Sequence, residues 1–347
     1  MTPVDKCILT STVSGTLSEW VTRLSPSSIS VLTDTNTRVH CLPLLKSALP
    51  SFHEITIEPG ENHKNLTSAA FIWEKLTETK TDRKGLVIVL GGGVLGDMGG
   101  FCAATYKRGV SFILIPTTLL AQVDASVGGK LAIDFKNFKN HIGVFQEPTC
   151  TIIDTSFLKT LPESEIRSGF AEIIKHCLIA DKNMWSDVRG KKLIEQDWNR
   201  LVAHSVGIKK MITDKDPKES GLRKILNFGH TIGHAIESAA LSTRNQLLHG
   251  EAIAIGMICE SHIAHSKGMI TNEDLKEITG YLRSVFNTVT IHANLEELMT
   301  LMAQDKKNVG DKILMSLLYG IGYCRWDIEI HKEEIAASLA YYSGTGQ

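Results

Sequence analysis

A run of glycines directly after a short apolar segment constrains the fold of this 347-residue chain more than any other feature. Residues 86–90 are typical of a buried β-strand, residues 91–100 contain six glycines, and a helical pattern follows. A strand, a glycine-rich turn and a helix N-terminus are the parts of a dinucleotide site, because backbone N–H groups can approach a pyrophosphate there. Tight packing of the helix against the strand explains the same glycines equally well, so this motif alone leaves both interpretations open.

The first half of the chain alternates short apolar runs with amphipathic stretches. Residues 30–34 and 112–116 are further candidate buried strands, and residues 62–78 carry apolar side chains at helical spacing. Strands that alternate with helices indicate a parallel sheet covered on both faces. We therefore predict a Rossmann-like α/β domain over residues 1–158.

Helical periodicity dominates the rest of the chain, which predicts a second, mainly helical domain over residues 159–347. One strand-like run, residues 313–319, comes late. The helical patterns cover residues 163–180, 193–213, 225–240, 251–267 and 273–285.

Composition excludes several classes of function. A formal net charge of -1 argues against binding nucleic acid or a membrane surface through bulk charge. No two of the seven cysteines have CxxC spacing, so we expect reduced thiols and neither a disulfide framework nor a thiolate zinc site. The sequence begins without a signal-peptide pattern and has no apolar run of about 18 residues. We expect a cytoplasmic protein that acts on small molecules.

Histidines and one carboxylate suggest a metal centre. His230 and His234 are four residues apart, so on a helix they share a face. His249 follows, and Glu172 stands three residues before Lys175 in an otherwise apolar helical segment. Two imidazoles and a carboxylate with an open position form a suitable catalytic zinc site, whereas a satisfied core histidine is the ordinary alternative. The spacing leaves open which three of the four residues bind the metal, and an HExxH metalloprotease is disfavoured because no Glu follows the first histidine.

Basic and amide side chains at segment ends and in apolar surroundings suit a small, multiply anionic substrate. A solvated surface charge is the default interpretation of each one, and only convergence in space would single them out. They are Arg108, Lys130, Lys139, Asn140, Lys175, Lys209, Arg223, Asn227, Lys306 and Lys307.

In their order along nearly the whole chain, the motifs resemble those of the 3-dehydroquinate synthase family, a member of the sugar-phosphate cyclase superfamily. Each segment alone is modest evidence for the family, but the set of segments in this order is highly specific for it. The matching segments are residues 59–64, 91–97, 104–109, 116–130, 139–140, 169–175, 221–223, 227–234, 248–251 and 305–307.

The resemblance implies a homodimeric lyase of the shikimate pathway, which leads to chorismate and the aromatic amino acids. Such an enzyme converts 3-deoxy-D-arabino-heptulosonate 7-phosphate to 3-dehydroquinate and phosphate. NAD is used transiently: a hydroxyl is oxidised, phosphate is eliminated, the ketone is reduced again, and the opened ring closes by an intramolecular aldol step. Zinc is the implied metal, with cobalt as a possible substitute.

The resemblance also implies roles for individual residues. Zinc would be held by Glu172, His230 and His249. NAD would be contacted by Asp34, Glu61, Lys64, Gly91, Gly92, Gly93, Asp97, Thr117, Thr118 and Lys139. The substrate phosphate would be held by Asn140, Asn227, His234, Lys306 and by Arg108 reaching in from the other protomer, the carboxylate by Lys130 and Arg223, and the reacting hydroxyls by Asp124, Lys175 and Lys209.

Three alternative functions can be compared with this one: another sugar-phosphate cyclase, a polyol dehydrogenase and a catalytically inactive relative. Other sugar-phosphate cyclases act on substrates without a carboxylate, and a metal-dependent polyol dehydrogenase would release NADH. Arg223 with Lys130 favours a carboxylated substrate, because a buried cation without an anionic partner is costly. A catalytically inactive relative is disfavoured because the metal ligands and the glycine loop are all present.

Overall fold

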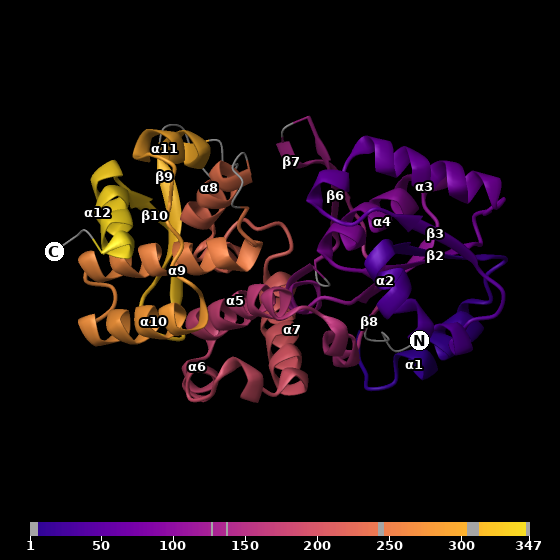
Figure 1. Ribbon diagram of the computed structural model, residues 1–347, viewed down its shortest axis with the longest axis horizontal. Helices are drawn as coiled ribbons and strands as arrows, with labels where there is room; N and C mark the ends of the chain where they lie inside the picture. The colour runs from indigo at the N-terminus through magenta and orange to yellow at the C-terminus, as the bar shows by residue number, and fades with distance from the viewer. Residues whose placement is uncertain (1–5, 126–127, 137, 242–245, 304–311, 345–347) are drawn as a thin grey trace. The chain divides into compact units, whose positions relative to one another are not determined.

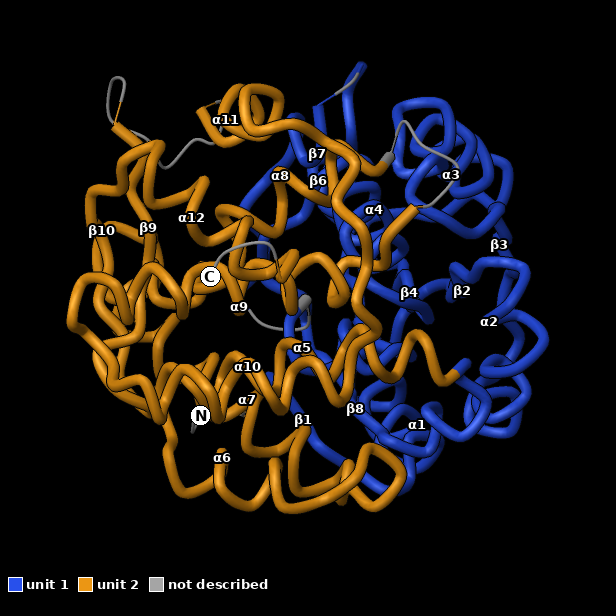
Figure 2. Tube along the Cα trace, turned by 60° about the vertical axis from the view of Figure 1, so that its left-hand side comes forward, with its two compact units in different colours: residues 1–162 blue, residues 163–347 orange. Residues whose placement is uncertain are grey.

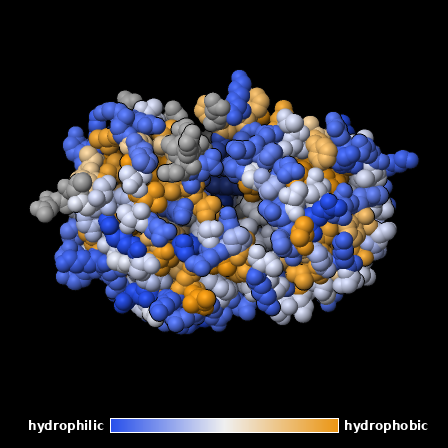
Figure 3. All heavy atoms as spheres, viewed as in Figure 1, coloured by the Kyte–Doolittle hydropathy of each residue, from blue (hydrophilic) through white to orange (hydrophobic). Residues whose placement is uncertain are grey.

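The computed structural model describes residues 6–125, 128–136, 138–241, 246–303 and 312–344. The chain divides into two compact units, Met1–Pro162 and Glu163–Gln347, which Figure 2 shows in different colours. The boundary expected from sequence, after residue 158, falls inside a 3-10 helix, η6 (Thr155–Thr160). On the face shown in Figure 3, hydrophilic and hydrophobic residues are interspersed over both units.

Unit 1, coloured from indigo to magenta in Figure 1, contains a six-stranded sheet in which every pair of neighbouring strands is parallel. This confirms the predicted α/β fold with a parallel sheet, and the strand-like runs predicted from sequence in this unit correspond to β2 (Ile29–Asp34), β4 (Leu86–Gly91) and β5 (Ser111–Pro116). The strands lie in the order β1 (Cys7–Leu9), β8 (Cys150–Ile153), β5 (Ser111–Pro116), β4 (Leu86–Gly91), β2 (Ile29–Asp34) and β3 (His53–Ile57).

Strand β4 separates two apolar cores, and all of its residues are buried. Val87 lies in the core formed with α3 (Leu66–Glu78) and α4 (Gly93–Thr105). Its neighbour Ile88 lies in the other core, formed with α1 (Val13–Leu24). Successive side chains of a strand point to opposite faces, so a strand covered on both sides is apolar throughout.

Two details of unit 1 differ from the sequence-based expectation. Helix α3 begins later than predicted because the Asn65 side chain accepts a hydrogen bond from the N–H of Ser68 (3.1 Å) and caps it there. An antiparallel hairpin of β6 (Lys130–Phe135) and β7 (Phe138–Phe145) was not predicted.

Unit 2 is organised around one buried helix, α9 (His249–Ser266). It contacts α5 (Glu163–Ala180), α8 (His230–Leu241), α10 (Asn272–Val285) and α12 (Lys332–Ser343). A helix with neighbours on all sides is apolar all round, and this explains the weakly amphipathic sequence of α9.

The remaining elements complete the mainly helical unit, as predicted. Helix α8 starts later than the sequence pattern suggested, and residues 222–227 instead form a 3-10 helix, η8 (Leu222–Asn227). The other elements are α6 (Lys182–Arg189), the 3-10 helix η7 (Leu193–Glu195), α7 (Trp198–Lys215), α11 (Leu295–Ala303) and a hairpin of β9 (Ile313–Leu318) and β10 (Cys324–Ile330). Within the described ranges, none of the helices combines the length and the apolar character that crossing a membrane requires.

Candidate functional site

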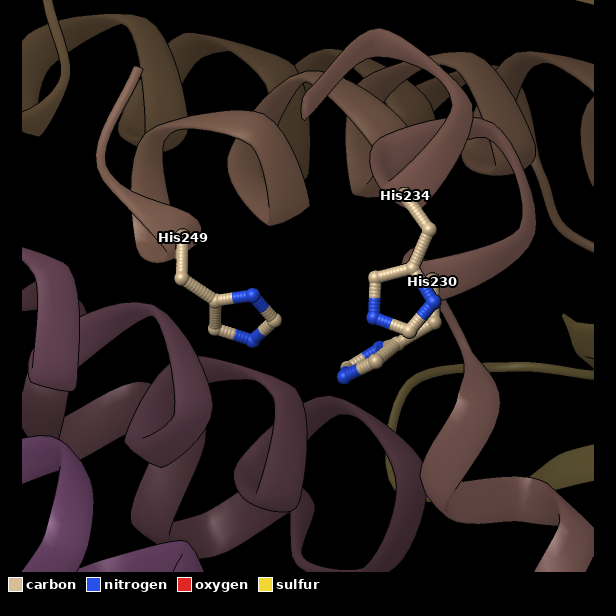
Figure 4. Close-up of side chains that lie close together, drawn as sticks. All are labelled: His230, His234 and His249. Atoms are coloured by element: carbon tan, nitrogen blue, oxygen red, sulfur yellow. The ribbon is translucent and has the colours of Figure 1, made fainter. Parts of the chain in front are cut away.

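Three histidines of unit 2 form a cluster, shown in Figure 4. His230 and His234 lie one turn apart at the start of α8, and His249 is the first residue of α9. Their ring centroids are 5.0 to 5.7 Å apart, and Figure 4 shows the rings grouped around one space. Since one ring nitrogen of each lies within 4.8 Å of the others, the three side chains can contribute to one metal site.

Glu172 of α5 reaches the same cluster from the interior of the unit. Its side chain is fully buried, and its Oε1 lies 3.4 Å from His230 Nε2 and 3.6 Å from His249 Nε2. Burial opposes ionisation, but the ammonium of Lys175, with which Glu172 forms an ion pair, outweighs burial and holds the pKa of Glu172 well below its usual range. The carboxylate is therefore charged at ordinary pH and faces both imidazoles.

The Nδ1 atoms of the same two histidines contact acceptors on their other side. His230 Nδ1 lies 3.1 Å from the Phe228 carbonyl oxygen, which can only accept a hydrogen bond. Burial and then the charge of Lys175 lower the pKa of His230 to about 4, so its ring is neutral, with the hydrogen on Nδ1 and a lone pair on Nε2. This is the tautomer that a metal ligand needs when Nε2 binds.

His249 lies between two carboxylates. Its Nδ1 is 3.3 Å from Glu237 Oε2, while its Nε2 faces Glu172. Burial disfavours the charged ring, but the hydrogen bonds to Glu172 and Glu237 outweigh burial and raise the pKa of His249 to about 10. The surroundings therefore favour a positive charge at this point, and the donor set of one carboxylate oxygen and two imidazole nitrogens fits a divalent metal ion.

Of the other predicted residues of unit 2, those that the structure describes lie on elements that pack together: α5, α7 and η8. Lys209 is buried on α7, and Arg223 is buried in η8 with its Nη1 donating to the carbonyl of Pro217 (2.9 Å). In the described part of the chain, the Arg223 guanidinium forms no ion pair. Asn227 donates to Glu219 (2.9 Å), while Lys306 and Lys307 lie outside the described residues.

In unit 1, several of the predicted cofactor residues lie where neighbouring parallel strands end. Asp34 ends β2, Gly91 ends β4, and the N–H of Thr117, directly after β5, donates to the carbonyl of Gly91 (3.0 Å). Gly92 is the N-cap of α4, and a Cβ on it would lie 3.0 Å from the Thr118 side chain. The carboxyl edge of a parallel sheet is where α/β folds bind ligands.

The two interpretations of the glycine-rich segment apply to different glycines. A Cβ on Gly99 would lie 2.7 Å from Leu32 and 2.8 Å from Val89, so this glycine is needed for close packing of α4 on the sheet. Gly93 instead begins α4, and Gly96 has open space around it. Packing accounts for the later glycine, while the first turn of α4 keeps an open helix N-terminus suited to an anion.

A buried lysine connects residues for which different roles were predicted. Lys64 is buried, and its Nζ donates to Asp97 Oδ2 (2.6 Å) and Asn140 Oδ1 (2.6 Å). Lys139 lies 3.8 Å from a carboxylate oxygen of Glu61. The structure thus brings Asn140, expected at the substrate phosphate, into contact with Lys64, expected at NAD, and Lys64 in turn contacts Asp97.

The three other predicted residues of unit 1 lie in separate places along the chain. Asp124 is half-buried in a short π-helical turn, η5 (Ala121–Ala125), and Lys130 is exposed at the start of β6. Arg108 is exposed, with a left-handed backbone (φ 68°) at the end of the 3-10 helix η4 (Tyr106–Arg108).

Two glutamates near the histidines were not predicted from sequence. Glu237 lies on α8, three residues after His234 and seven after His230, so helical spacing was a signal for it. Glu260 is a fully buried carboxylate in the otherwise apolar helix α9, and its position in an apolar run was the corresponding signal.

Solved structures with the same fold include two kinds of enzyme. A 2-epi-5-epi-valiolone synthase from Streptomyces hygroscopicus, solved with NAD+ and Zn2+, superposes with a TM-score of 0.88 at 24% identity over 99% of this chain and 98% of that one. A 2-deoxy-scyllo-inosose synthase with carbaglucose-6-phosphate, NAD+ and Co2+ gives 0.86 at 22% over 96% of both chains. An NADH-dependent butanol dehydrogenase from Thermotoga maritima gives 0.69 at 13% over 99% and 97%. The fold is the one these cyclases and dehydrogenases share.

Sequence comparison is more specific than the fold. Residues 54–168 match the N-terminal domain of 3-dehydroquinate synthase, and residues 169–308 match its C-terminal domain. The 3-dehydroquinate synthase of Parabacteroides distasonis is 39% identical, covering 97% of both chains, and that of Campylobacter concisus is 40% identical, covering 82% of both. The chain belongs to the 3-dehydroquinate synthase family.

Proposed function

We propose that the protein is a 3-dehydroquinate synthase, which converts 3-deoxy-D-arabino-heptulosonate 7-phosphate to 3-dehydroquinate and phosphate. Membership of the family supports this activity. The structural observation that carries it is the convergence of His230 Nε2 and His249 Nε2 on one oxygen of the buried Glu172, because the reaction needs a metal beside a hydroxyl that is oxidised.

Glu172, His230 and His249 are the metal ligands in this proposal, with His234 left to contact the substrate. The neutral His230 ring and the two carboxylates around His249 support this choice over a site made of three histidines. Bound zinc, or cobalt in its place, would lower the pKa of a substrate hydroxyl and polarise the ketone formed from it.

NAD binding is proposed at the carboxyl edge of the unit 1 sheet. The open first turn of α4 offers backbone N–H groups to the pyrophosphate, and polar side chains surround this edge. The proposed NAD contacts are Asp34, Glu61, Lys64, Gly91, Gly92, Gly93, Asp97, Thr117, Thr118 and Lys139.

For the substrate we propose contacts that neutralise its two anionic groups. Lys130 and the buried guanidinium of Arg223 would bind the carboxylate, and Asp124, Lys175 and Lys209 would address the reacting hydroxyls. The phosphate would be held by Arg108, Asn140, Asn227, His234 and Lys306. We also propose a homodimer in which Arg108 serves the other protomer's site, and a cytoplasmic place in the shikimate pathway.

The chemical steps require the protein mainly to position groups and balance charge. The carbon that carries one substrate hydroxyl would give a hydride to NAD while that hydroxyl loses its proton to solvent, and the resulting ketone would acidify the adjacent C–H. Phosphate would leave as the C–H proton is removed, and a hydride and a proton would then return to the ketone. The ring opens and closes again as a carbocycle by an aldol reaction, so no NADH accumulates and the enzyme is a phosphate-eliminating lyase.

The first test is release of phosphate from 3-deoxy-D-arabino-heptulosonate 7-phosphate with NAD and zinc present. We expect one 3-dehydroquinate for each phosphate, no net NADH, and loss of activity after chelation that zinc restores. Release from a carboxylate-free sugar phosphate alone would indicate a neighbouring cyclase. Steady NADH production from a polyol would indicate a dehydrogenase.

Arg223→Gln tests the proposed carboxylate contact. The substitution removes a charge-assisted pair, so we expect kcat/KM for the carboxylated substrate to fall about 10- to 150-fold, mostly through KM. Arg200→Gln is the matched control, because Arg200 forms an exposed pair with Asp187 on the surface of unit 2. Equal kinetics for Arg223→Gln and the wild type would contradict the contact and favour a substrate without a carboxylate.

A further inference from the structure

The first turn of α8 has no capping side chain of its own. The residue before His230 is Gly229, which has a left-handed backbone (φ 80°) and no side-chain oxygen. The first N–H groups of a helix have no partner inside it and need an acceptor from elsewhere. The helix that carries two of the three clustered histidines therefore depends on a group from outside its own sequence.

Glu260 of α9 supplies that acceptor. Its side chain is fully buried, and its Oε2 accepts from the N–H of Gly229 at 2.5 Å. Its Oε1 accepts from the N–H of Ile232 at 3.3 Å, and this is the third helical N–H, which a local Ser or Asp cap would bind. A carboxylate also suits the positive end of the helix dipole, so Glu260 caps α8 from a different helix.

Glycines bring the two helices close enough for this contact. A Cβ on Gly256 would lie 1.9 Å from the Gly229 carbonyl oxygen, and a Cβ on Gly233 would lie 2.9 Å from the Ala252 carbonyl oxygen. The main chains of α8 and α9 therefore touch. Glu260 follows Gly256 by one helical turn, which places its carboxylate beside the start of α8.

The capped turn also holds the proposed metal ligand. His230 is its first residue, the Phe228 carbonyl that accepts from His230 Nδ1 lies just before it, and His230 Nε2 faces Glu172 at 3.4 Å. We propose that Glu260 is a positioning residue for the metal centre: it fixes the first turn of α8 so that His230 points at Glu172. The inference rests on the proposed function, because it takes Glu172, His230 and His249 as the ligands.

Glu260→Gln tests the proposal, since glutamine keeps the size of the side chain but replaces one accepting oxygen with an NH2 group. The zinc dissociation constant of the metal-depleted protein is measured by competition with a chromophoric chelator. We expect zinc binding about 10- to 100-fold weaker than in the wild type, the usual effect of losing a group that orients a metal ligand.

Glu277→Gln is the matched control. Glu277 lies on α10 and accepts from the Trp185 indole N–H (2.6 Å), so the control removes a partly buried acceptor of the same kind from the same unit. We expect its zinc affinity to match the wild type. A Glu260→Gln protein that is less stable but binds zinc as the wild type does would overturn the proposal.

A second measurement needs no metal. Hydrogen exchange of residues 228–236 in the metal-depleted proteins should be faster in Glu260→Gln than in the wild type and Glu277→Gln, and unchanged exchange would count against the cap. If Glu260→Gln does not fold, the shorter carboxylate of Glu260→Asp is tested by the same two measurements with the same outcomes. Failure of the wild type to bind zinc would instead contradict the proposed function.

Discussion

Replacing Glu172 with Gln is expected to remove the bound metal and to lower kcat roughly 10³-fold, which corresponds to several kcal/mol of transition-state stabilisation. The glutamine amide is uncharged, so the substitution removes the only negative charge among the three proposed metal ligands, Glu172, His230 and His249. It also leaves the Lys175 ammonium, which is almost fully buried, without its anionic partner. Breaking one side of a buried ion pair costs about 3–5 kcal/mol, so stability should fall as well.

The measurements are metal content after gel filtration, the rate of phosphate release, and thermal unfolding. Glu163→Gln is the control on the same helix: Glu163 is exposed and pairs with Arg167, so metal content and rate should not change. The double variant Glu172→Gln with Lys175→Met should recover stability without recovering metal. Full metal content and full turnover in Glu172→Gln would show that Glu172 is not a ligand.

Gly250→Ala is expected to destabilise unit 2 and to weaken the metal site together. A Cβ on Gly250 would lie 2.0 Å from the main-chain carbonyl oxygen of Ser168, so α9 and α5 must move apart. Ser168 is one turn before Glu172, and Gly250 directly follows His249, so the movement separates two proposed ligands. Overpacking typically costs about 1–3 kcal/mol, and more where the obstacle is main chain, as here.

Gly280→Ala is the matched glycine control. Gly280 lies within α10 with no atom within 4 Å of an added Cβ, so alanine should stabilise the protein by about 0.5–1 kcal/mol. The urea midpoint and the zinc dissociation constant are measured for both variants. An unchanged midpoint for Gly250→Ala would contradict the close contact between α5 and α9.

Much of the fold follows from local pattern, and the differences arise from contacts between residues that are far apart in the chain. The apolar run of β4 identifies a strand covered on both faces, and the helical period of α5 identifies its full length. Strand β1 is too short for its pattern to stand out, and its place at the edge of the sheet depends on pairing with β8, far along the chain. Helix α8 starts late because a cap from α9 sets its first turn, and such a contact between distant residues leaves no local mark in the sequence.

The site, too, is predicted by local spacing only in part, and the rest depends on contacts between distant residues. Spacing within one helix places His230 and His234 on one face, and the structure agrees. That Glu172 and His249 join them depends on the packing of α5, α8 and α9, which no spacing describes. The family resemblance proposes these ligands, while the orientation of their Nδ1 atoms toward Phe228 and Glu237 could be learned only from the folded chain.

The proposed ligands come from three helices that also form the interior of unit 2. A metal ion held by all three would act as a cross-link between distant parts of the chain, and its binding free energy would add to the unfolding free energy of that unit. Zinc supply in the cell would then govern how long each molecule survives as well as how fast it works. Protein without bound zinc would unfold more often and be degraded sooner, so the amount of this protein in the cell would depend on the zinc supply.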